Sequence, residues 1–204
     1  MKRALILVDI QNDFLPGGAL AVPDGDLVVP VANRIMNRFE LVVATQDWHP
    51  AGHSSFASQH DGRNIGDMIE LNGAPQILWP DHCVQNTPGA EFAPGLNRDG
   101  IMHVVRKGMD KGIDSYSGFF DNDHARATGM EAYLRQQKAN DLYIMGLATD
   151  YCVKYTALDA RQLGFNVNLI EEGVRGVELN KGDCEKAIQE MQDAGVKMIG
   201  RDDV

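Results

Sequence analysis

A chain of 204 residues, 44% of them apolar, fits one α/β domain over residues 1–204 and leaves little room for a second. Its formal net charge of −10 at pH 7 argues against nucleic acid or an anionic membrane as a partner. The three cysteines are odd in number and widely spaced, which argues against a disulfide framework and favours a reducing compartment.

The first apolar run, Arg3–Val8, follows basic residues and superficially resembles the start of a signal peptide. The run stops at Asp9, however, and no small-residue cleavage site follows it. No other segment approaches the roughly 20 apolar residues that a membrane span requires. We therefore expect a cytoplasmic protein that does not associate with membranes.

Six short apolar runs alternate with segments of helical character along the chain. Their near-continuous apolarity is typical of parallel strands, which are buried on both faces. The alternation predicts an α/β fold around a six-stranded, mainly parallel sheet. The predicted strands are Arg3–Val8, Leu41–Thr45, Ile101–Val105, Leu142–Leu147, Asn166–Ile170 and Val196–Ile199.

Helices are predicted between these strands from apolar spacing and from residues that begin or end helices. One helix is expected to open with a capping box formed by Thr128 and Glu131. Two others are expected to end at Gly164 and Gly195, because glycine readily adopts the conformation of a helix C-cap. The remaining predicted bounds are Leu27–Arg38, Cys152–Leu163 and Lys181–Ala194.

The connection between the second and third strands, Trp48–Gly100, is unusually long. It is rich in His, Gly and Pro and shows little periodicity. Such a long connection in a compact domain is usually functional or disordered. Its aromatic residues argue against disorder, so we expect a functional loop.

Polar residues follow four of the predicted strands. They are Asp9 after the first, Asp47-Trp48-His49 after the second, Lys107 after the third and Cys152 shortly after the fourth. In an open parallel sheet, side chains beyond the carboxyl ends of the strands converge on one crevice. The sequence therefore predicts an active site at this edge.

Cys152 is the leading candidate nucleophile. At the start of a predicted helix, the helix dipole and free N–H groups favour a thiolate and can stabilise an oxyanion. A cysteine in an apolar setting is more often an inert core residue, but convergence with Asp9 and Lys107 favours a reactive one. Cys83 lies in irregular loop beside a candidate ligand, and Cys184 is assigned no role.

Asp9 and Lys107 are the candidate partners of the cysteine. Asp9 can take the thiol proton and later protonate the leaving group. Alternatively, it caps a turn, a common role for aspartate at a strand end. Lys107 can lower the pKa of the cysteine and keep the carboxylate ionised, although a lysine after a strand is usually a solvated charge.

A metal site is indicated by Asp47 and His49, whose side chains project to the same side of an extended segment. His53 and His82 can add nitrogen ligands from the long loop. Nitrogen and oxygen ligands without thiolate suit Zn, Mn or Fe. The alternative is a pair of hydrogen-bonded loop histidines.

Trp79, close to His82, can form one wall of a flat pocket for a planar substrate.

Four motifs, in order along the chain, together resemble the nicotinamidase/pyrazinamidase family of isochorismatase-like cysteine hydrolases. The motifs are Asp9-Ile10-Gln11-Asn12-Asp13-Phe14, Asp47-Trp48-His49-Pro50, Trp79-Pro80-Asp81-His82-Cys83 and Gly146-Leu147-Ala148-Thr149-Asp150-Tyr151-Cys152. The first motif is shared by the whole superfamily, whereas the set of four is highly specific. The resemblance implies a three-layer α/β/α fold.

The resemblance also implies a chemistry. The catalytic triad would be Cys152, Asp9 and Lys107, and the oxyanion hole would use the N–H groups of Ala148 and Cys152 beside a cis Leu147–Ala148 bond. Thiolate attack on nicotinamide would release ammonia, form a thioester and yield nicotinic acid. Pyrazinamide would be a second substrate, and the product would serve pyridine nucleotide biosynthesis and NAD salvage.

For the substrate ring and the metal, the resemblance implies two further sets of residues. The ring would lie between Phe14, Trp79 and Tyr116. One divalent metal ion, Zn with Mn and Fe as alternatives, would position the pyridine ring. Its ligands would be Asp47, His49 and His82, with His53 bound directly or through water. The resemblance leaves a homo-oligomeric state open.

Several alternative functions compete with nicotinamide hydrolysis. A metal-independent cysteine hydrolase of the same superfamily, acting on a carbamoyl or ureido substrate, would not need Asp47, His49 and His82. An isochorismate-type hydrolase would lack the cysteine nucleophile. A zinc hydrolase would attack its substrate with metal-bound water. A non-catalytic metal-binding protein is the remaining alternative.

Overall fold

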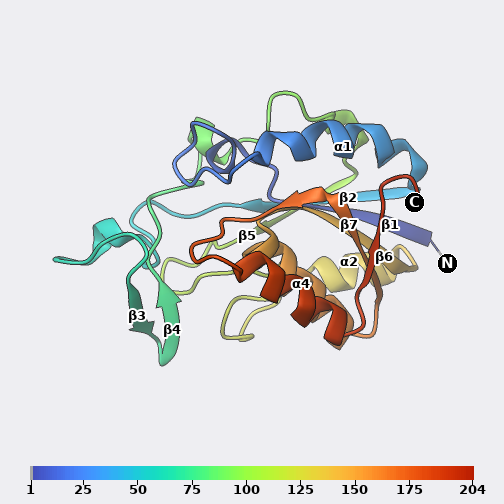
Figure 1. Cartoon of the computed structure of the whole chain (residues 1–204). Helices are drawn as coiled ribbons and strands as arrows, with labels where there is room; N and C mark the ends of the chain where they lie inside the picture. Colours follow the sequence, from blue (N-terminus) through green and yellow to red (C-terminus); the bar gives the residue numbers. More distant parts are fainter. Residues whose placement is uncertain (1) are drawn as a thin grey trace.

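A six-stranded sheet runs through the centre of the protein in the computed structural model, which describes residues 2–204 (Figure 1). The strand order is β5-β2-β1-β6-β7-β8, and each neighbouring pair is parallel. The strands are β1 (Lys2–Val8), β2 (Leu41–Asp47), β5 (His103–Lys107), β6 (Ala139–Leu147), β7 (Asn166–Arg175) and β8 (Lys197–Ile199). The predicted six-stranded parallel sheet is confirmed.

Helices cover both faces of this sheet (Figure 1). The helix α1 (Val28–Ile35) packs on one face, and α2 (Met130–Gln136), α3 (Lys154–Gln162) and α4 (Asp183–Asp193) pack on the other. Side chains of β1 alternate between the two cores, because successive residues of a strand point to opposite faces. Burial on both faces explains why the strands read as continuous apolar runs, and the three layers match the expected α/β/α fold.

Two helix starts differ from the sequence prediction. The capping box at Thr128 does not form, because its hydroxyl donates to the carbonyl of Gly118 and accepts from the Met130 N–H. Gly129 is the N-cap instead, and Glu131 pairs with Arg135.

Upstream of α3, the segment Thr149–Val153 is a π-helical turn, so Cys152 precedes the regular helix. The predicted segment Leu27–Arg38 likewise divides into α1 and the 3-10 turn Met36–Arg38.

The long connection contains a hairpin that the sequence analysis missed. Its strands, β3 (Met68–Leu71) and β4 (Ala74–Ile77), pair antiparallel through the two-residue turn Asn72-Gly73. Both turn residues have positive φ, +52° and +83°, as the favoured two-residue hairpin turns require. The Asn-Gly dipeptide was therefore the available signal. The hairpin projects from the body of the protein (Figure 1).

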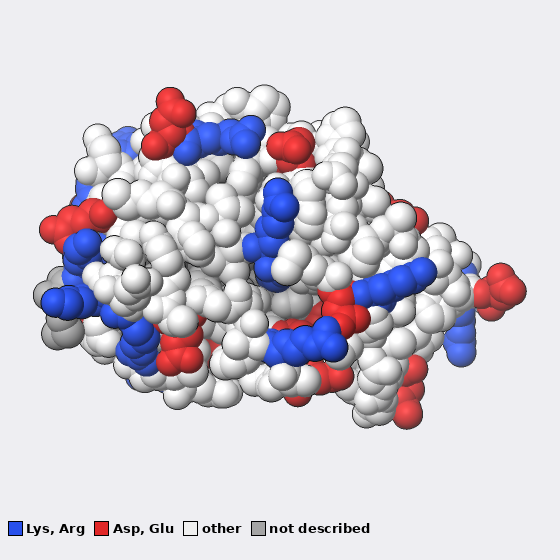
Figure 2. All heavy atoms as spheres, turned by 180° about the vertical axis from the view of Figure 1, so that it is seen from behind, with Lys and Arg blue, Asp and Glu red and all other residues white. Residues whose placement is uncertain are grey.

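Acidic and basic side chains are interspersed on the face shown in Figure 2, rather than separated by sign. That distribution offers no continuous basic surface on this face among the described residues. Within residues 2–204, every helix is too short or too polar to cross a bilayer.

The β1–β6 pair leaves no room for a side chain at Gly146, where it leads into the polar edge of the sheet. Gly146 lies opposite Val8 and has a φ of +124°. A Cβ atom at this position would overlap the carbonyl oxygen of Val8. Glycine is therefore required here both by the backbone conformation and by the approach of the strands.

We predict that Gly146→Ala lowers the free energy of unfolding by about 2–6 kcal/mol, since backbone strain and overlap each cost about 1–3 kcal/mol. Gly164→Ala is the matched control, because Gly164 also has a positive φ, +82°, but nothing lies within 4 Å of an added Cβ. Its expected loss is about 1–2 kcal/mol. Urea denaturation measures both, and equal losses would show that the β1–β6 approach tolerates a side chain.

Candidate active site

Asp9 follows β1 directly and is fully buried. Its backbone has a φ of +46°, and its N–H donates to the Thr45 hydroxyl at 3.1 Å. The same hydroxyl donates to Oδ1 of Asp9 at 2.6 Å. Thr45 in β2 therefore holds both the backbone and the side chain of Asp9. This geometry differs from a turn cap, because the Asp9 carboxylate turns toward side chains of the neighbouring strands.

Lys107 ends β5 and its side chain is completely buried. Its Nζ lies 2.9 Å from Oδ2 of Asp9, 2.8 Å from Oδ1 of Asp47 and 3.4 Å from Sγ of Cys152. It also donates to the carbonyl of Ser115 at 2.9 Å. Burial alone would lower the pKa of Lys107, but the two carboxylates raise it well above its usual value. Lys107 is therefore a buried ammonium and not a solvated surface charge.

The two carboxylates that share Lys107 are in different protonation environments. Burial raises the pKa of Asp9, and the nearby Asp47 adds to that rise, while Lys107 opposes it. Burial would also raise the pKa of Asp47, but Lys107 and His49 together hold it well below its usual value. Separated pKa values of this kind favour different roles for two neighbouring carboxylates. Asp9 is suited to exchange a proton, and Asp47 to remain anionic.

Cys152 lies in the π-helical turn, with its side chain in contact with Asp9 and Lys107. Burial raises the pKa of its thiol well above the usual value, and the attraction of Lys107 does not offset this. The raised pKa disfavours the thiolate, so Cys152 needs a base to take its proton. Asp9 lies within reach of the sulfur and can accept that proton.

The backbone next to Cys152 also has an unusual form. The peptide bond between Leu147 and Ala148 is cis, as the family resemblance implied. The carbonyl of Ala148 accepts hydrogen bonds from the N–H groups of Tyr151 and Val153, both at 3.1 Å, which flank that of Cys152. The turn thus brings the backbone of Ala148 and Cys152 together beside the thiol.

A second group of polar side chains lies on the other side of Lys107. Asp47, His49 and His82 are buried and each offers a ligand atom within 4.8 Å of the others. Nε2 of His49 and of His82 lie 3.2 and 3.7 Å from Oδ2 of Asp47. Nδ1 of His49 contacts the Gly108 carbonyl at 3.0 Å, and Nδ1 of His82 contacts the Pro80 carbonyl at 2.8 Å.

This donor set fits a divalent metal ion. Metal-binding histidines commonly donate one ring N–H to a carbonyl and direct the other nitrogen at the ion. Nε2 of His49 is buried and faces the Asp47 carboxylate at 3.2 Å, but it makes no well-aligned hydrogen bond and is free to bind a ligand. Asp47 outweighs the effect of burial and raises the pKa of His49 to about 9. Metal binding would displace that proton.

His53 lies beside this group, with its ring centroid 4.4 Å from that of His49. Its Nδ1 contacts the hydroxyl of Ser55 at 2.8 Å, and its Nε2 contacts the carbonyl of Ile113 at 3.3 Å. Both ring nitrogens of His53 therefore have protein partners. It also forms a buried group with His49 and Asp114.

Two motif residues, Gln11 and Asp13, position the ligand group. The amide of Gln11 donates to the Asp47 carbonyl and accepts from the Asp47 N–H, both at 2.8 Å. Asp13 accepts from the N–H of Cys83 at 2.7 Å, which fixes the residue after His82. Cys83 itself is fully buried in the core on the α1 side of the sheet. Cys83 therefore packs in the core and does not line the pocket described below.

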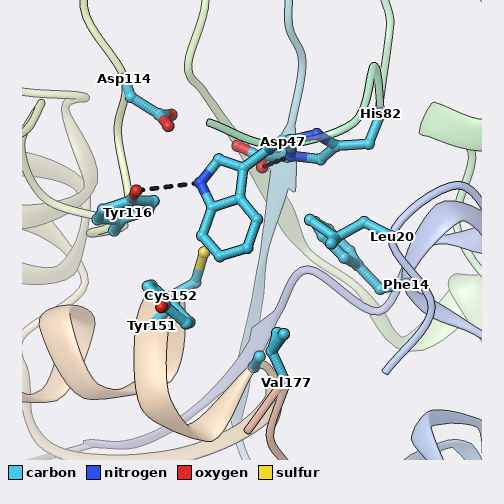
Figure 3. A pocket seen from close by; sticks show the side chains of 11 residues that line it. Phe14, Leu20, Asp47, His82, Asp114, Tyr116, Tyr151, Cys152 and Val177 are labelled. Atoms are coloured by element: carbon cyan, nitrogen blue, oxygen red, sulfur yellow. Dashed lines mark hydrogen bonds and ion pairs between the residues drawn. The ribbon is translucent and has the colours of Figure 1, made fainter. Parts of the chain in front are cut away.

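A pocket opens above these groups. Three predicted aromatic residues line it, namely Phe14, Trp79 and Tyr116. The Trp79 indole donates to the Tyr116 hydroxyl at 3.1 Å, which holds the two rings together. Cys152 and Asp47 also line the pocket, so the thiol and the ligand group face one space (Figure 3).

The sequence analysis missed several lining residues, namely Leu20, Asp114, Tyr151 and Val177. Tyr151 stacks edge-on against Trp79, with ring centroids 4.9 Å apart. Its position next to Cys152 in a motif was a usable signal. Leu20, Asp114 and Val177 come from loops in which no pattern of the sequence marks a pocket residue.

The chain matches the isochorismatase domain family over residues 3–203. The nicotinamidase of Escherichia coli (strain K12) is 52% identical over 200 residues, covering 96% of this chain and 93% of that protein. Among solved structures, a nicotinamidase/pyrazinamidase of Acinetobacter baumanii has a TM-score of 0.96 at 46% identity, covering 99% of this chain and 97% of that one.

A third similar protein is the pyrazinamidase of Pyrococcus horikoshii, solved in complex with zinc. It has a TM-score of 0.80 at 39% identity, covering 98% of this chain and 99% of that one. Fold, sequence and coverage agree across these comparisons. The chain therefore belongs to the nicotinamidase/pyrazinamidase family of isochorismatase-like hydrolases.

Proposed function

We propose that this protein hydrolyses nicotinamide to nicotinic acid and ammonia, and that it also accepts pyrazinamide. One observation carries the proposal: a thiol, a carboxylate and a buried ammonium are in contact beneath a pocket walled by aromatic rings. A planar heteroaromatic ring fits between such walls, and its carboxamide would then lie over Cys152. The free cysteines of the chain fit a reducing compartment such as the cytoplasm. The proposed product, nicotinic acid, would serve pyridine nucleotide biosynthesis and NAD salvage.

The acylation step uses Cys152 and Asp9. Asp9 takes the proton of the Cys152 thiol as the sulfur attacks the carboxamide carbon. The N–H groups of Ala148 and Cys152 donate to the oxygen as it becomes negative. Asp9 then delivers the proton to the amide nitrogen, the C–N bond breaks, and ammonia leaves a thioester on Cys152.

The deacylation step reverses these proton transfers. Asp9 takes a proton from a water molecule, which attacks the thioester carbon. The C–S bond breaks, the sulfur regains a proton and nicotinic acid is released. Throughout, Lys107 keeps its charge beside Asp9 and Cys152 and offsets the negative charge that passes between them.

Asp47, His49 and His82 are the residues that would hold one divalent metal ion, with zinc favoured over Mn and Fe. A divalent ion held by these residues would supply a Lewis acid for a ring nitrogen of the substrate, and the carboxamide would then be oriented over Cys152. His53 lies beside these ligands, but both of its ring nitrogens have protein partners, so a bond to the ion, direct or through water, would require one of those partners to be released.

The runner-up is a metal-independent cysteine hydrolase acting on a carbamoyl or ureido substrate. It shares the triad but gives no reason for the buried group of Asp47, His49 and His82, of which Asp47 and His82 line the pocket. A hydrolase that attacks with metal-bound water is a second alternative. It differs in one respect that can be measured, since it would not require Cys152.

We predict that Cys152→Ala abolishes nicotinamide turnover while the fold and the metal content are retained, because the sulfur forms the covalent bond. Ammonia release measures the activity, and mass spectrometry of a quenched wild-type reaction detects the thioester. Cys83→Ala is the control. It should keep substantial activity, since its contact with Asp13 is made by the backbone N–H. The reverse pattern would mean that the nucleophile is assigned to the wrong cysteine.

We predict that Asp9→Asn lowers kcat by more than the roughly 10²–10⁴-fold usual for a general base. The carboxylate both activates a thiol of raised pKa and protonates a poor leaving group, and an amide does neither. Steady-state kinetics at constant metal content measure the loss. An Asp9→Asn enzyme that kept a tenth of the wild-type kcat would remove Asp9 from the mechanism.

We predict that benzamide, which lacks the ring nitrogen, is a far poorer substrate than nicotinamide for the metal-loaded enzyme. Orientation by the ring nitrogen can be worth several kcal/mol. His49→Ala should lose the metal, measured by elemental analysis, and with it most of this difference. His103→Ala is the histidine control, because His103 stacks on Tyr133 outside the site. Equal kcat/KM for both amides on the loaded wild type would contradict a metal at the ring.

A further inference from the structure

We propose that Asp150 is a positioning residue that sets the size limit of the substrate pocket by holding Val177 at its wall. This inference rests on the proposed hydrolysis of nicotinamide and adds a determinant of substrate size to it. Asp150 belongs to the same motif as Cys152, yet the chemistry described above does not use it.

The carboxylate of Asp150 is fully engaged by the loop that follows β7. Asp150 lies in the π-helical turn of Cys152 and is 5% exposed. Its Oδ1 accepts from the Val177 N–H at 2.9 Å, and its Oδ2 accepts from the Glu178 N–H at 2.8 Å. A charged acceptor with two backbone donors makes a stronger attachment than neutral hydrogen bonds would.

The loop is shaped to make this contact. A Cβ atom at Gly176 would lie 3.1 Å from Oδ1 of Asp150 and would overlap the sulfur of Cys184, so the loop comes this close only with glycine there. Glu178 has a φ of +54°, and its carboxylate accepts from the N–H groups of Gly182 and Cys184. The loop is thus anchored to the turn of Cys152 at one end and to the start of α4 at the other.

The hydrogen bonds from the loop to Asp150 place Val177 at the pocket. It lines the pocket on the same side as Leu20 and Phe14 and packs against the core that contains Phe14 (Figure 3). The turn Thr149–Val153 therefore carries the nucleophile Cys152 and also, through Asp150, holds the apolar wall at Val177. A substrate ring that reaches Cys152 must fit against Val177, and the wall can recede only if the contact with Asp150 is released.

The test compares two substrates on Asp150→Asn. An asparagine keeps one acceptor oxygen but turns an NH2 group toward the second backbone N–H. Quinoline-3-carboxamide is the probe, because it keeps the ring nitrogen and carboxamide of nicotinamide and adds a fused ring. We expect KM for nicotinamide to rise about tenfold with little change in kcat, and its preference in kcat/KM over the probe to fall at least about tenfold.

Two further variants distinguish an effect on the pocket wall from a general effect on folding. Val177→Ala leaves Asp150 and its contacts in place and should reproduce the loss of preference. Asp183→Asn is the control, since Asp183 accepts from the Asn180 N–H at 2.9 Å at the far end of the same loop. It should leave the preference unchanged. Unchanged preference in Val177→Ala, or an equal fall in kcat for both substrates in Asp150→Asn, would overturn the proposal.

A measurement without turnover keeps this inference separate from the proposed function. Alkylation of Cys152 by iodoacetamide and by the bulkier N-phenylmaleimide is followed by peptide mass spectrometry. Asp150→Asn and Val177→Ala should raise the rate with the maleimide several-fold relative to iodoacetamide. If the wild type fails to hydrolyse nicotinamide, the proposed function is wrong, whereas equal relative rates in all variants would reject the role of Asp150.

Discussion

The buried ammonium of Lys107 is the interaction on which the rest of this site depends. Two carboxylates, Asp9 and Asp47, are removed from water at adjacent strand ends, and each is tolerable there because the same cation contacts both. Removing one partner of a buried ion pair typically costs about 3–5 kcal/mol, since the remaining charge is left without compensation. The triad and the ligand group are therefore two halves of one electrostatic unit.

That unit gives chemically identical side chains different properties. Lys107 and His49 hold the pKa of Asp47 low. Asp9 has Lys107 as its cationic neighbour, but burial leaves its pKa raised. A carboxylate that accepts and returns a proton needs the second environment, whereas a metal ligand needs the first. The arrangement of the parallel strands produces this difference, because it places Lys107 between the two carboxylates.

Around this unit, two motif residues and Thr45 of β2 position the reacting groups. Gln11 holds the backbone of Asp47, Thr45 holds the backbone and side chain of Asp9, and Asp13 holds the residue after His82. The bonds of Gln11 and Thr45 are buried and that of Asp13 is partly buried, and all of them join segments far apart in the sequence. Because a buried polar group without its partner is destabilising, these contacts allow few alternative arrangements of the strand ends.

The sequence by itself determined the sheet and the location of the site. Apolar runs reveal strands buried on both faces, and polar residues at their carboxyl ends must converge. Tertiary structure decided what depends on neighbours distant in the chain. Burial raises the pKa of the Cys152 thiol, a contact with Gly118 removes the predicted capping box at Thr128, and the loop after β7 places Val177 in the pocket wall. Periodicity reports which face of an element is buried, but desolvation, hydrogen-bond partners and loop paths depend on residues that only the fold brings together.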